Sequence, residues 1–401
     1  MVGEDVQAVV DALAGRLGRS VAVDDPAIRL IAASRHFGDE DPVRVRSVLD
    51  RQVKPEIQRW ILSKGIADWT EPGMVTGNTE FDIAPRLCFP VRCNGMLLGY
   101  VWLIGSEDDL TGDTVEVVLD AADSIALILY RRVLLHERER FRAESSLRLL
   151  LSPDSDDRAR AVAEIQDEGL LAGTAHAVVL VAEIDSEASA DDTVALEAAA
   201  EHLERRLPPR SALTLVRRHR AVVVIGGARP LGDKAAREVA EHLRTGFFEF
   251  AKSSRRCVVG IGADWPGLAS VADSYRQAAT AVRAALLLPM FGDVTSWASL
   301  GPFALLLRID LEQLTQDLPF PGVADLFGNP EHQVLVTSVE EFLDRAGDAG
   351  RTAEALHVHR TTLYHRLKRV ETITGLSLDD GLDRLTLHLA LKLSRISGTG
   401  R

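Results

Sequence analysis

The stretch from residue 352 to 374 restricts the fold of this 401-residue chain more than any other. It holds two helix-forming runs, TAEALHV and RTTLYHRLKRVETIT, with room for only a tight turn between them. Two helices joined so closely have to cross at a steep angle, as in a helix-turn-helix. Apolar positions of both runs fall where they can form one shared core, namely Leu356, Val358, Leu363, Leu367 and Val370.

The outward side of the second run is polar and basic. It carries Arg360, Thr361, Thr362, Tyr364, His365, Arg366, Lys368 and Arg369. Guanidinium groups can fork onto guanine O6 and N7 or onto phosphates, while hydroxyl groups and rings reach base edges and thymine methyl groups. Thr361 and Thr362 also stand near a helix N-terminus, where backbone N–H groups attract phosphate. We therefore predict that these residues bind double-stranded DNA.

The charge distribution points to the same partner. The whole chain has a formal net charge of −13. Residues 345–401 hold ten Lys or Arg and six Asp or Glu, a net charge of +4, so residues 1–344 carry −13 − 4 = −17. An acidic body with one basic module is a common composition for a nucleic-acid-binding protein.

Residues 334–396 closely resemble the C-terminal helix-turn-helix of the PucR/CdaR-type bacterial transcriptional regulators. The family form L-H-V-H-R-N-T-L-x-Y-R-L-x-R-I-E-x-x-T-G is matched at Leu356, His357, Val358, His359, Arg360, Thr362, Leu363, Arg366, Leu367, Arg369, Glu371, Thr374 and Gly375. Thr361 replaces the usual Asn, His365 replaces the usual Tyr, and Val370 replaces Ile. The first two departures bear on the DNA sequence that is read.

The resemblance continues upstream and implies a function. The middle segment looks like the degenerate GGDEF-like domain of such regulators, and the N-terminal segment looks like a GAF- or PAS-type sensory domain. The resemblance thus implies a ligand-responsive, sequence-specific transcription factor that works as a homodimer or higher oligomer. It implies no enzymatic activity and no cofactor.

The first segment, residues 1–132, has the pattern of an α+β domain. An amphipathic helix opens it, and SVAVDDPAIRLIAAS reads as two strands around an Asp-Asp-Pro turn. A second hairpin is predicted where Asn94-Gly95 separates RLCFPVRC from MLLGYVWLI, because Asn-Gly suits the tight turn of a two-residue hairpin.

Large aromatic residues are concentrated in this first segment. They are Trp60, Trp69, Phe81, Phe89, Tyr100 and Trp102, in a chain that is only 5% aromatic. They could line a cavity for a small effector. Packing in an ordinary core is the favoured explanation for any single residue among them, and the pocket stays open as the alternative.

A long helical pattern begins at Thr111 and runs into the charged stretch HERERFRAE. We expect residues 133–157 to form a helical connector and a dimer seam. A core helix with a solvated tail is an equally good explanation of the pattern.

The rest of the chain divides into a middle domain, a linker and a C-terminal domain. Residues 158–300 show the order β, α, β, β, α, β, α, which predicts a ferredoxin-like sheet with its helices on one face. Residues 301–330 read as a proline-punctuated linker, and residues 331–401 as an all-α domain. The predicted fold class is thus α+β with several domains.

Two other functions remain as alternatives. The middle domain could bind a nucleotide or act as a cyclase, but its central hairpin reads RRHR at residues 217–220 and offers no carboxylate for a metal ion. The basic helix could instead serve a scaffold that binds an acidic protein. We predict no metal site, because His357, His359 and His365 have no cysteine nearby and isolated H-x-H pairs are usually structural.

Composition favours a cytoplasmic location. We find no apolar run near the roughly 18 residues of a membrane span and no secretory signal after Met1. Three cysteines, Cys88, Cys93 and Cys257, fit reduced thiols rather than a disulfide framework. Cys88 and Cys93 could sense oxidants, although inert packing is the favoured explanation.

Overall fold

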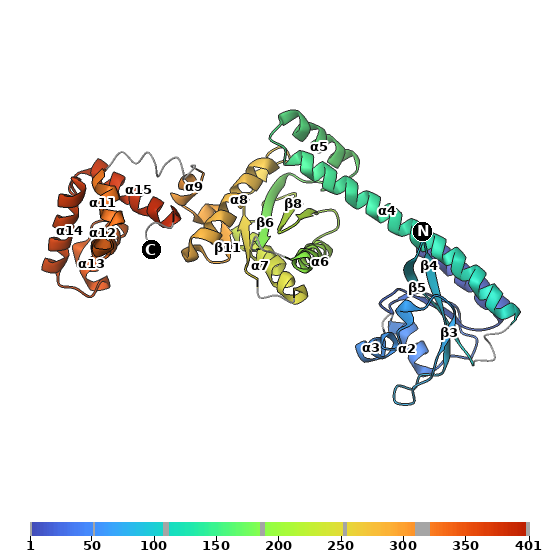
Figure 1. Ribbon diagram of the computed structural model, residues 1–401. Helices are drawn as coiled ribbons and strands as arrows, with labels where there is room; N and C mark the ends of the chain where they lie inside the picture. The colour runs from blue at the N-terminus through green and yellow to red at the C-terminus, as the bar shows by residue number, and fades with distance from the viewer. Residues whose placement is uncertain are drawn as a thin grey trace. The chain divides into compact units, whose positions relative to one another are not determined.

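The computed structural model describes residues 2–50, 53–106, 112–184, 189–251, 255–308 and 321–397. The chain divides into two compact units, Met1–Phe141 and Arg142–Arg401, which are described separately (Figure 1). None of the described helices is long and apolar enough to cross a membrane.

The first unit is built around a five-stranded antiparallel sheet of order β2-β1-β5-β4-β3. Its strands are β1 (Val21–Asp24), β2 (Leu30–Ala33), β3 (Gly73–Val75), β4 (Arg86–Cys93) and β5 (Met96–Ile104). Its helices are α1 (Val2–Leu17), α2 (Pro42–Asp50), α3 (Pro55–Leu62) and the 3-10 helix η1 (Ile66–Asp68), followed by α4 (Asp113–Leu150).

Both hairpins expected from the sequence are confirmed. β1 pairs with β2, and β4 pairs with β5 through Cys93 and Met96. Asn94 and Gly95 have φ values of 49° and 78°, the left-handed backbone that a tight two-residue turn requires. The turn sets the register of the two central strands, and with it the set of side chains that each face of the sheet receives.

Each face of this sheet is covered by a separate hydrophobic core. Val21 and Val23 point to the face that packs against α1 and the N-terminal half of α4. Ala22, one residue along the strand, points to the other face and packs with Ile57 and Ile61 of α3. Neighbouring residues of a strand alternate between faces, so one short strand supplies both cores.

Helix α4 runs without interruption for 38 residues. Val118 and Ile125 are buried in the first unit, while Leu147 and Leu150 are buried in a core of the second. The helix ends at Leu150, and Asp154 caps the start of α5 (Ser155–Asp167) by accepting hydrogen bonds from the N–H groups of Asp156 and Asp157. The charged stretch HERERFRAE is therefore helical throughout.

The second unit begins with a six-stranded sheet and its helices. The strands are β6 (His176–Ile184), β7 (Ala212–Arg217), β8 (Arg220–Gly227), β9 (Cys257–Ile261), β10 (Trp265–Pro266) and β11 (Val294–Ser296). The helices are α6 (Ala190–Arg206), α7 (Asp233–Phe250), α8 (Val271–Leu287) and the 3-10 helices η3 (Pro289–Phe291) and η4 (Trp297–Ser299). The order β9-β6-β8-β7 within the sheet is that of the expected ferredoxin-like βαββαβ core, and β11 adds a parallel strand beside β9.

The expectation that the helices cover one face of this sheet is wrong. Helices α6 and α7 pack against one face, and α8, α5 and the end of α4 pack against the other (Figure 1). The physical reason lies in the strands: β6 is buried on both sides, with Leu180 facing one core and Val179 facing the other. A strand with an unbroken apolar run needs cover on both faces.

The C-terminal part of the second unit is all α. Its elements are α9 (Phe303–Leu306), α11 (Pro321–Gly328), η5 (Pro330–His332), α12 (Gln333–Asp344), α13 (Ala349–Ala355), α14 (Arg360–Thr374) and α15 (Gly381–Ser397). Val323 and Leu326 of α11 share one core with α12 and α14. The far end of α15, with Leu393 and Ile396, packs in a smaller cluster with residues of α8 and α9.

Substitution of Gly260 tests how closely β9 and α8 approach. A Cβ atom at Gly260 would lie 2.1 Å from the Ala278 carbonyl oxygen and 2.7 Å from the Val282 nitrogen, and backbone atoms cannot move aside cheaply. We expect Gly260→Ala to cost at least about 1–3 kcal/mol in the free energy of unfolding, measured by urea denaturation.

Gly246→Ala in α7 is the matched control. Its Cβ atom would lie 3.5 Å from that of Ala199, an ordinary contact, and alanine favours a helix over glycine by about 0.5–1 kcal/mol. Equal losses of stability in the two variants would contradict the close approach of β9 and α8.

Candidate functional site

The predicted helix-turn-helix is formed by α13 and α14. His357, with φ of 52°, adopts the left-handed backbone and reverses the chain between the two helices. Asp348 caps α13 by accepting hydrogen bonds from the N–H groups of Gly350 and Arg351. His359 caps α14, where its Nδ1 accepts from the Thr361 N–H. Histidine 359 therefore has a structural role at the turn, and the described residues hold no cluster suited to a metal ion.

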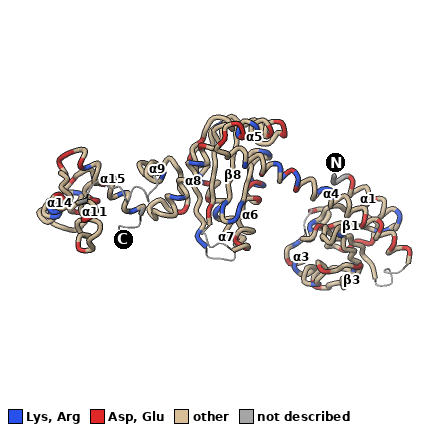
Figure 2. Tube along the Cα trace, turned by 45° about the horizontal axis from the view of Figure 1, so that its top comes forward, with Lys and Arg blue, Asp and Glu red and all other residues tan. Residues whose placement is uncertain are grey.

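The helix α14 separates its side chains into two faces. Leu363, Leu367 and Val370 are buried in the domain core. Seven of the eight predicted DNA-binding residues are exposed, namely Arg360, Thr361, Thr362, Tyr364, His365, Lys368 and Arg369. Figure 2 marks the Lys and Arg positions of α14 in blue. The described structure thus brings these seven onto one solvent-facing helix with an apolar anchor beneath.

Arg366 lies differently from the other basic residues of α14. It is half-buried, and its Nη1 donates a hydrogen bond to Ser338 Oγ of α12 over 3.2 Å. Lys368 forms a pair with Glu371 at 3.1 Å but keeps most of its side chain in solvent. Arg369 makes no hydrogen bond or ion pair within the described part of the chain, so its guanidinium group is free to take a new partner.

A second candidate site lies in the first unit, in the core between the sheet and α3. Five of the six aromatic residues expected to line a pocket lie there: Trp60, Trp69, Phe81, Tyr100 and Trp102. Phe89 does not join them. It lies on the opposite face of the sheet, in the core with α1 and α4, because strand parity directs it away from Cys88 and Trp102.

Charged side chains enter the same region, and one pair of them is fully satisfied. Asp41, at the start of α2, accepts a hydrogen bond from the Arg44 N–H at 2.7 Å and another from the Ala84 N–H at 2.9 Å. The same carboxylate forms an ion pair with the buried guanidinium group of Arg86. The two charges of this pair neutralise each other, so neither group needs a further partner.

Asp24 and Arg44 are buried without such partners. Asp24 is 8% exposed and Arg44 is 9% exposed, yet neither the carboxylate nor the guanidinium group makes a hydrogen bond to any described residue. Burial raises the pKa of Asp24 to about 6, and the positive charges of Arg44 and then Arg86 oppose that rise. Trp102 Nε1 also lowers this pKa slightly, but its geometry falls short of a hydrogen bond.

The sequence alone did not single out Asp24 or Arg44. Asp24 reads as a turn residue of an Asp-Asp-Pro cluster, and no local pattern marks Arg44. The alternation of side chains along the strand could have indicated that Asp24 is buried, since Asp24 shares a face with Ala22 and lies opposite Tyr100 on β5. Arg44 has no comparable signal, because α2 is buried through tertiary contacts rather than through an apolar stripe.

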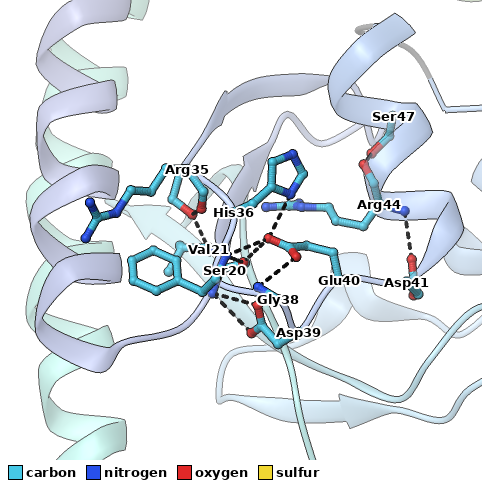
Figure 3. Close-up of polar contacts among 12 residues, drawn as sticks. Ser20, Val21, Arg35, His36, Gly38, Asp39, Glu40, Asp41, Arg44 and Ser47 are labelled. Carbon is cyan, nitrogen blue, oxygen red and sulfur yellow. Dashed lines mark hydrogen bonds and ion pairs between the residues drawn. The ribbon is translucent and has the colours of Figure 1, made fainter.

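The loop that precedes α2 is held by a hydrogen-bonded carboxylate (Figure 3). Glu40 accepts from the N–H groups of Phe37 and Gly38, each at 3.1 Å, from Ser20 Oγ, and pairs with His36 at 3.0 Å. Burial alone would raise the pKa of Glu40, but the hydrogen bonds from Ser20 and Phe37 outweigh it and lower the pKa to about 2. This loop fixes the position at which α2 begins, and it thereby fixes the position of Arg44.

The cysteines of the first unit differ in environment. Cys88 is buried, and burial raises the pKa of its thiol far above its usual range. Because the thiolate is the reactive form, this environment supports the inert interpretation for Cys88. Cys93 is half-exposed.

The raised pKa of Asp24 predicts a pH-dependent stability. The folded pKa of about 6 exceeds the unfolded value near 3.8, so the folded state binds more protons between these values and stability falls as pH rises. Two pKa units correspond to about 3 kcal/mol above pH 6. Asp24→Asn should remove this penalty and raise the stability of the first unit at pH 7.5 relative to pH 4.

Urea unfolding followed by tryptophan fluorescence measures this effect, since Trp60, Trp69 and Trp102 lie in the first unit. Asp123→Asn, at an exposed position of α4, is the control and should leave the pH profile unchanged. An Asp24→Asn profile parallel to that of the unmodified protein would refute the assignment.

Alanine substitutions of Arg366 and Arg369 in α14 should have different effects on the free energy of unfolding. Arg366→Ala should lower the free energy of unfolding by about 1 kcal/mol, because it removes the hydrogen bond to Ser338 and the packing of a half-buried stem. Arg369→Ala should stay within about 0.5 kcal/mol of the unmodified protein, as exposed substitutions usually do. Denaturation followed by circular dichroism measures the free energy of unfolding of both variants. Equal losses in the two variants would contradict the structural role of Arg366.

Comparison with known proteins matches two parts of the chain to described domains. Residues 335–393 match the PucR C-terminal helix-turn-helix domain, and residues 153–284 match the GGDEF-like domain. The first match covers α12 to α15 up to Leu393, and the second covers the ferredoxin-like sheet through β9 and most of α8.

Relatives of similar length extend the likeness to nearly the whole chain. The proline-responsive transcriptional activator PutR of Bacillus subtilis is 22% identical over 404 residues, which cover 98% of this chain and 97% of PutR. The DNA-binding transcriptional activator AdeR of the same organism is 18% identical over 96% of this chain and 92% of its own. The carbohydrate diacid regulator of Escherichia coli is 25% identical over 76% of this chain and 78% of its own.

These matches confirm the resemblance seen in the sequence, and they agree with the exposed basic face of α14. With a PucR C-terminal helix-turn-helix domain, a GGDEF-like domain and similarity to relatives named as transcriptional regulators, the chain is a DNA-binding transcription regulator that resembles the PucR/CdaR-type proteins.

Proposed function

We propose that this regulator binds operator DNA through the exposed face of α14 and that a small effector, bound in the first unit, controls this binding. The contact residues are Arg360, Thr361, Thr362, Tyr364, His365, Lys368 and Arg369, with Arg366 holding α14 onto α12. The protein acts in the cytoplasm, where bacterial DNA lies. The observation that carries the proposal is a helix with an apolar anchor and an exposed cationic side.

The chemistry of this face suits a major groove. The exposed Tyr364 and His365 can contact base edges, while Lys368 and Arg369 can contact phosphate or guanine. Thr361 and Thr362 lie in the first turn of α14, where free backbone N–H groups favour a phosphate. Because His359 occupies the cap with its ring nitrogen, the first turn keeps its position without an acidic residue that would repel DNA.

Two copies of the chain would present two such helices. On α4, Leu127, Leu134 and Phe141 are exposed and stand seven residues apart, the spacing of a coiled-coil seam. Glu137 and Arg142 flank this stripe with opposite charges, which suits pairing between parallel helices. A homodimer would fix the separation of two half-sites on the operator.

The first unit supports a sensory role of the GAF or PAS type. Its central antiparallel sheet carries α3 and a core with unsatisfied polar groups on one face, and α1 and α4 on the other. Relatives named as proline-responsive and as a carbohydrate diacid regulator support control by a small metabolite. Because α4 belongs to both units, an effector in the first could alter the strain or position of this shared helix.

An enzymatic middle domain is less well supported. The β7–β8 hairpin presents Arg217, Arg218 and His219, where a cyclase would need carboxylates for its metal ions. Arg220 is paired with Glu183, its Nε lying 2.8 Å from Oε2. We therefore assign the middle domain a structural or signalling role, with no catalytic activity.

Arg369→Ala tests the DNA interface. It should weaken operator binding by about 1–3 kcal/mol if the contact is to a base, or reduce the slope of log K against log salt by about 1 if it is to phosphate. Measurement requires fluorescence anisotropy with an operator duplex, selected from genomic fragments by the unmodified protein, at several salt concentrations.

Arg205→Ala is the matched control. It removes one positive charge from an exposed position of α6, where Nη1 lies a distant 3.9 Å from Glu201. Its binding should equal that of the unmodified protein. If Arg369→Ala and Arg205→Ala bind alike, the assignment of α14 as the recognition helix fails. If the unmodified protein binds no duplex DNA, the scaffold alternative is favoured instead.

A further inference from the structure

The core beneath α3 contains polar atoms that no described group satisfies. Tyr100 Oη and Trp102 Nε1 are both buried and have no hydrogen-bond partner. Tyr100 is 0% exposed and Trp102 is 4% exposed, and their rings lie side by side with centroids 5.8 Å apart. A buried hydroxyl or indole N–H without a partner is rare, because each has lost the hydrogen bonds that it makes with water.

Two unpaired charges occupy the same core. The Asp24 carboxylate lies beside Trp102 Nε1, and Arg44 is the positive charge that acts on it most strongly. The two groups are nevertheless not in ion-pair contact in the described structure. Each of these two buried charges still needs a partner of opposite charge, and a ligand that carries both charges would supply both partners.

The local backbone directs the Asp24 side chain into this core. The register between β1 and β2 shifts between Val23 and Asp24, a bulge of the kind that redirects a side chain next to a binding site. Asp24 stands directly opposite Tyr100 on β5, and Gly99 allows this approach, since a Cβ there would lie 2.3 Å from the Asp24 carbonyl oxygen. The geometry is therefore built into the pairing of the two strands.

The charge balance selects the class of ligand. Asp41 and Arg86 neutralise each other, so the open pair consists of one negative and one positive group. A ligand of net zero charge with an ammonium and a carboxylate group would satisfy both and keep the core neutral. The surrounding residues, among them Ile57, Ile61 and Trp60, are apolar and suit a small uncharged side chain.

We propose that this core is a binding site for a small α-amino acid, with Asp24 receiving its ammonium group, Arg44 its carboxylate, and Trp102 and Tyr100 donating further hydrogen bonds. This inference rests on the proposed function for its regulatory meaning, and it assigns the ligand class of that sensory unit. Binding of the amino acid itself requires no DNA.

The experiment measures thermal unfolding and calorimetric binding of the full chain with each of the twenty standard L-amino acids at millimolar concentration. We expect at least one of them to raise the melting temperature by several degrees. Its matched carboxylic acid without the amino group, and its amide without the free carboxylate, should each bind at least tenfold more weakly. A carboxylic acid that binds as tightly as the amino acid would overturn the assignment of Asp24.

Three variants separate binding from structure. Asp24→Asn and Tyr100→Phe remove groups that have no partner without ligand, so each should keep or raise the melting temperature of the free protein and lose at least tenfold in amino acid affinity. Arg44→Met also removes the charge that opposes the raised pKa of Asp24, so its readout is affinity alone, which should fall at least tenfold. Arg46→Met, on the exposed side of the same helix α2, is the matched control and should bind like the unmodified protein.

The proposal is overturned if none of the twenty amino acids binds the unmodified protein. It is also overturned if Tyr100→Phe and Asp24→Asn lower the stability of the free protein and leave binding unchanged, because the groups would then be satisfied by buried water. Tyr100→Phe conserves shape, so a folding defect does not obscure the result. Failure here leaves operator binding by α14 intact, and a failed Arg369→Ala test leaves amino acid binding intact.

Discussion

The sharing of helix α4 between two hydrophobic cores is the constraint on which the organisation of this protein depends. Its N-terminal half completes the core of the first unit, and Leu147 and Leu150 at its end belong to the core of the second. One helix thus contributes buried apolar side chains to the cores of both units.

The first unit combines two cores of different character. The face toward α1 and α4 is uniformly apolar and needs nothing beyond close packing. The face toward α3 holds buried charges and orphaned polar atoms, a costly arrangement that a fold without a ligand would have little reason to keep. The apolar packing that stabilises the unit thus lies on one side of the sheet, and the proposed binding site lies on the other.

The C-terminal domain divides its tasks in a similar way. The buried residues Leu363, Leu367 and Val370 anchor α14, and the hydrogen bond from Arg366 to Ser338 adds a fixed point against α12. The remaining basic side chains keep their charge in solvent at little cost in free energy, which leaves them accessible to DNA in the proposed interface. At the end of α15, Leu393 and Ile396 pack with α8 and α9, so the DNA-binding domain is also attached to the GGDEF-like domain.

The sequence by itself determined what depends on neighbours along the chain. The turn at Asn94-Gly95, the amphipathic helices, the ferredoxin-like order of elements and the basic face of α14 all follow from residues a few positions apart, and they sufficed to recognise the family. Tertiary structure decided which residues meet across long separations. It placed Phe89 in one core and Tyr100 in another, put helices on both faces of the second sheet, joined Asp41 to Arg86 and left Asp24 and Arg44 open. Such outcomes depend on strand register and on the burial of distant segments, which no local pattern encodes.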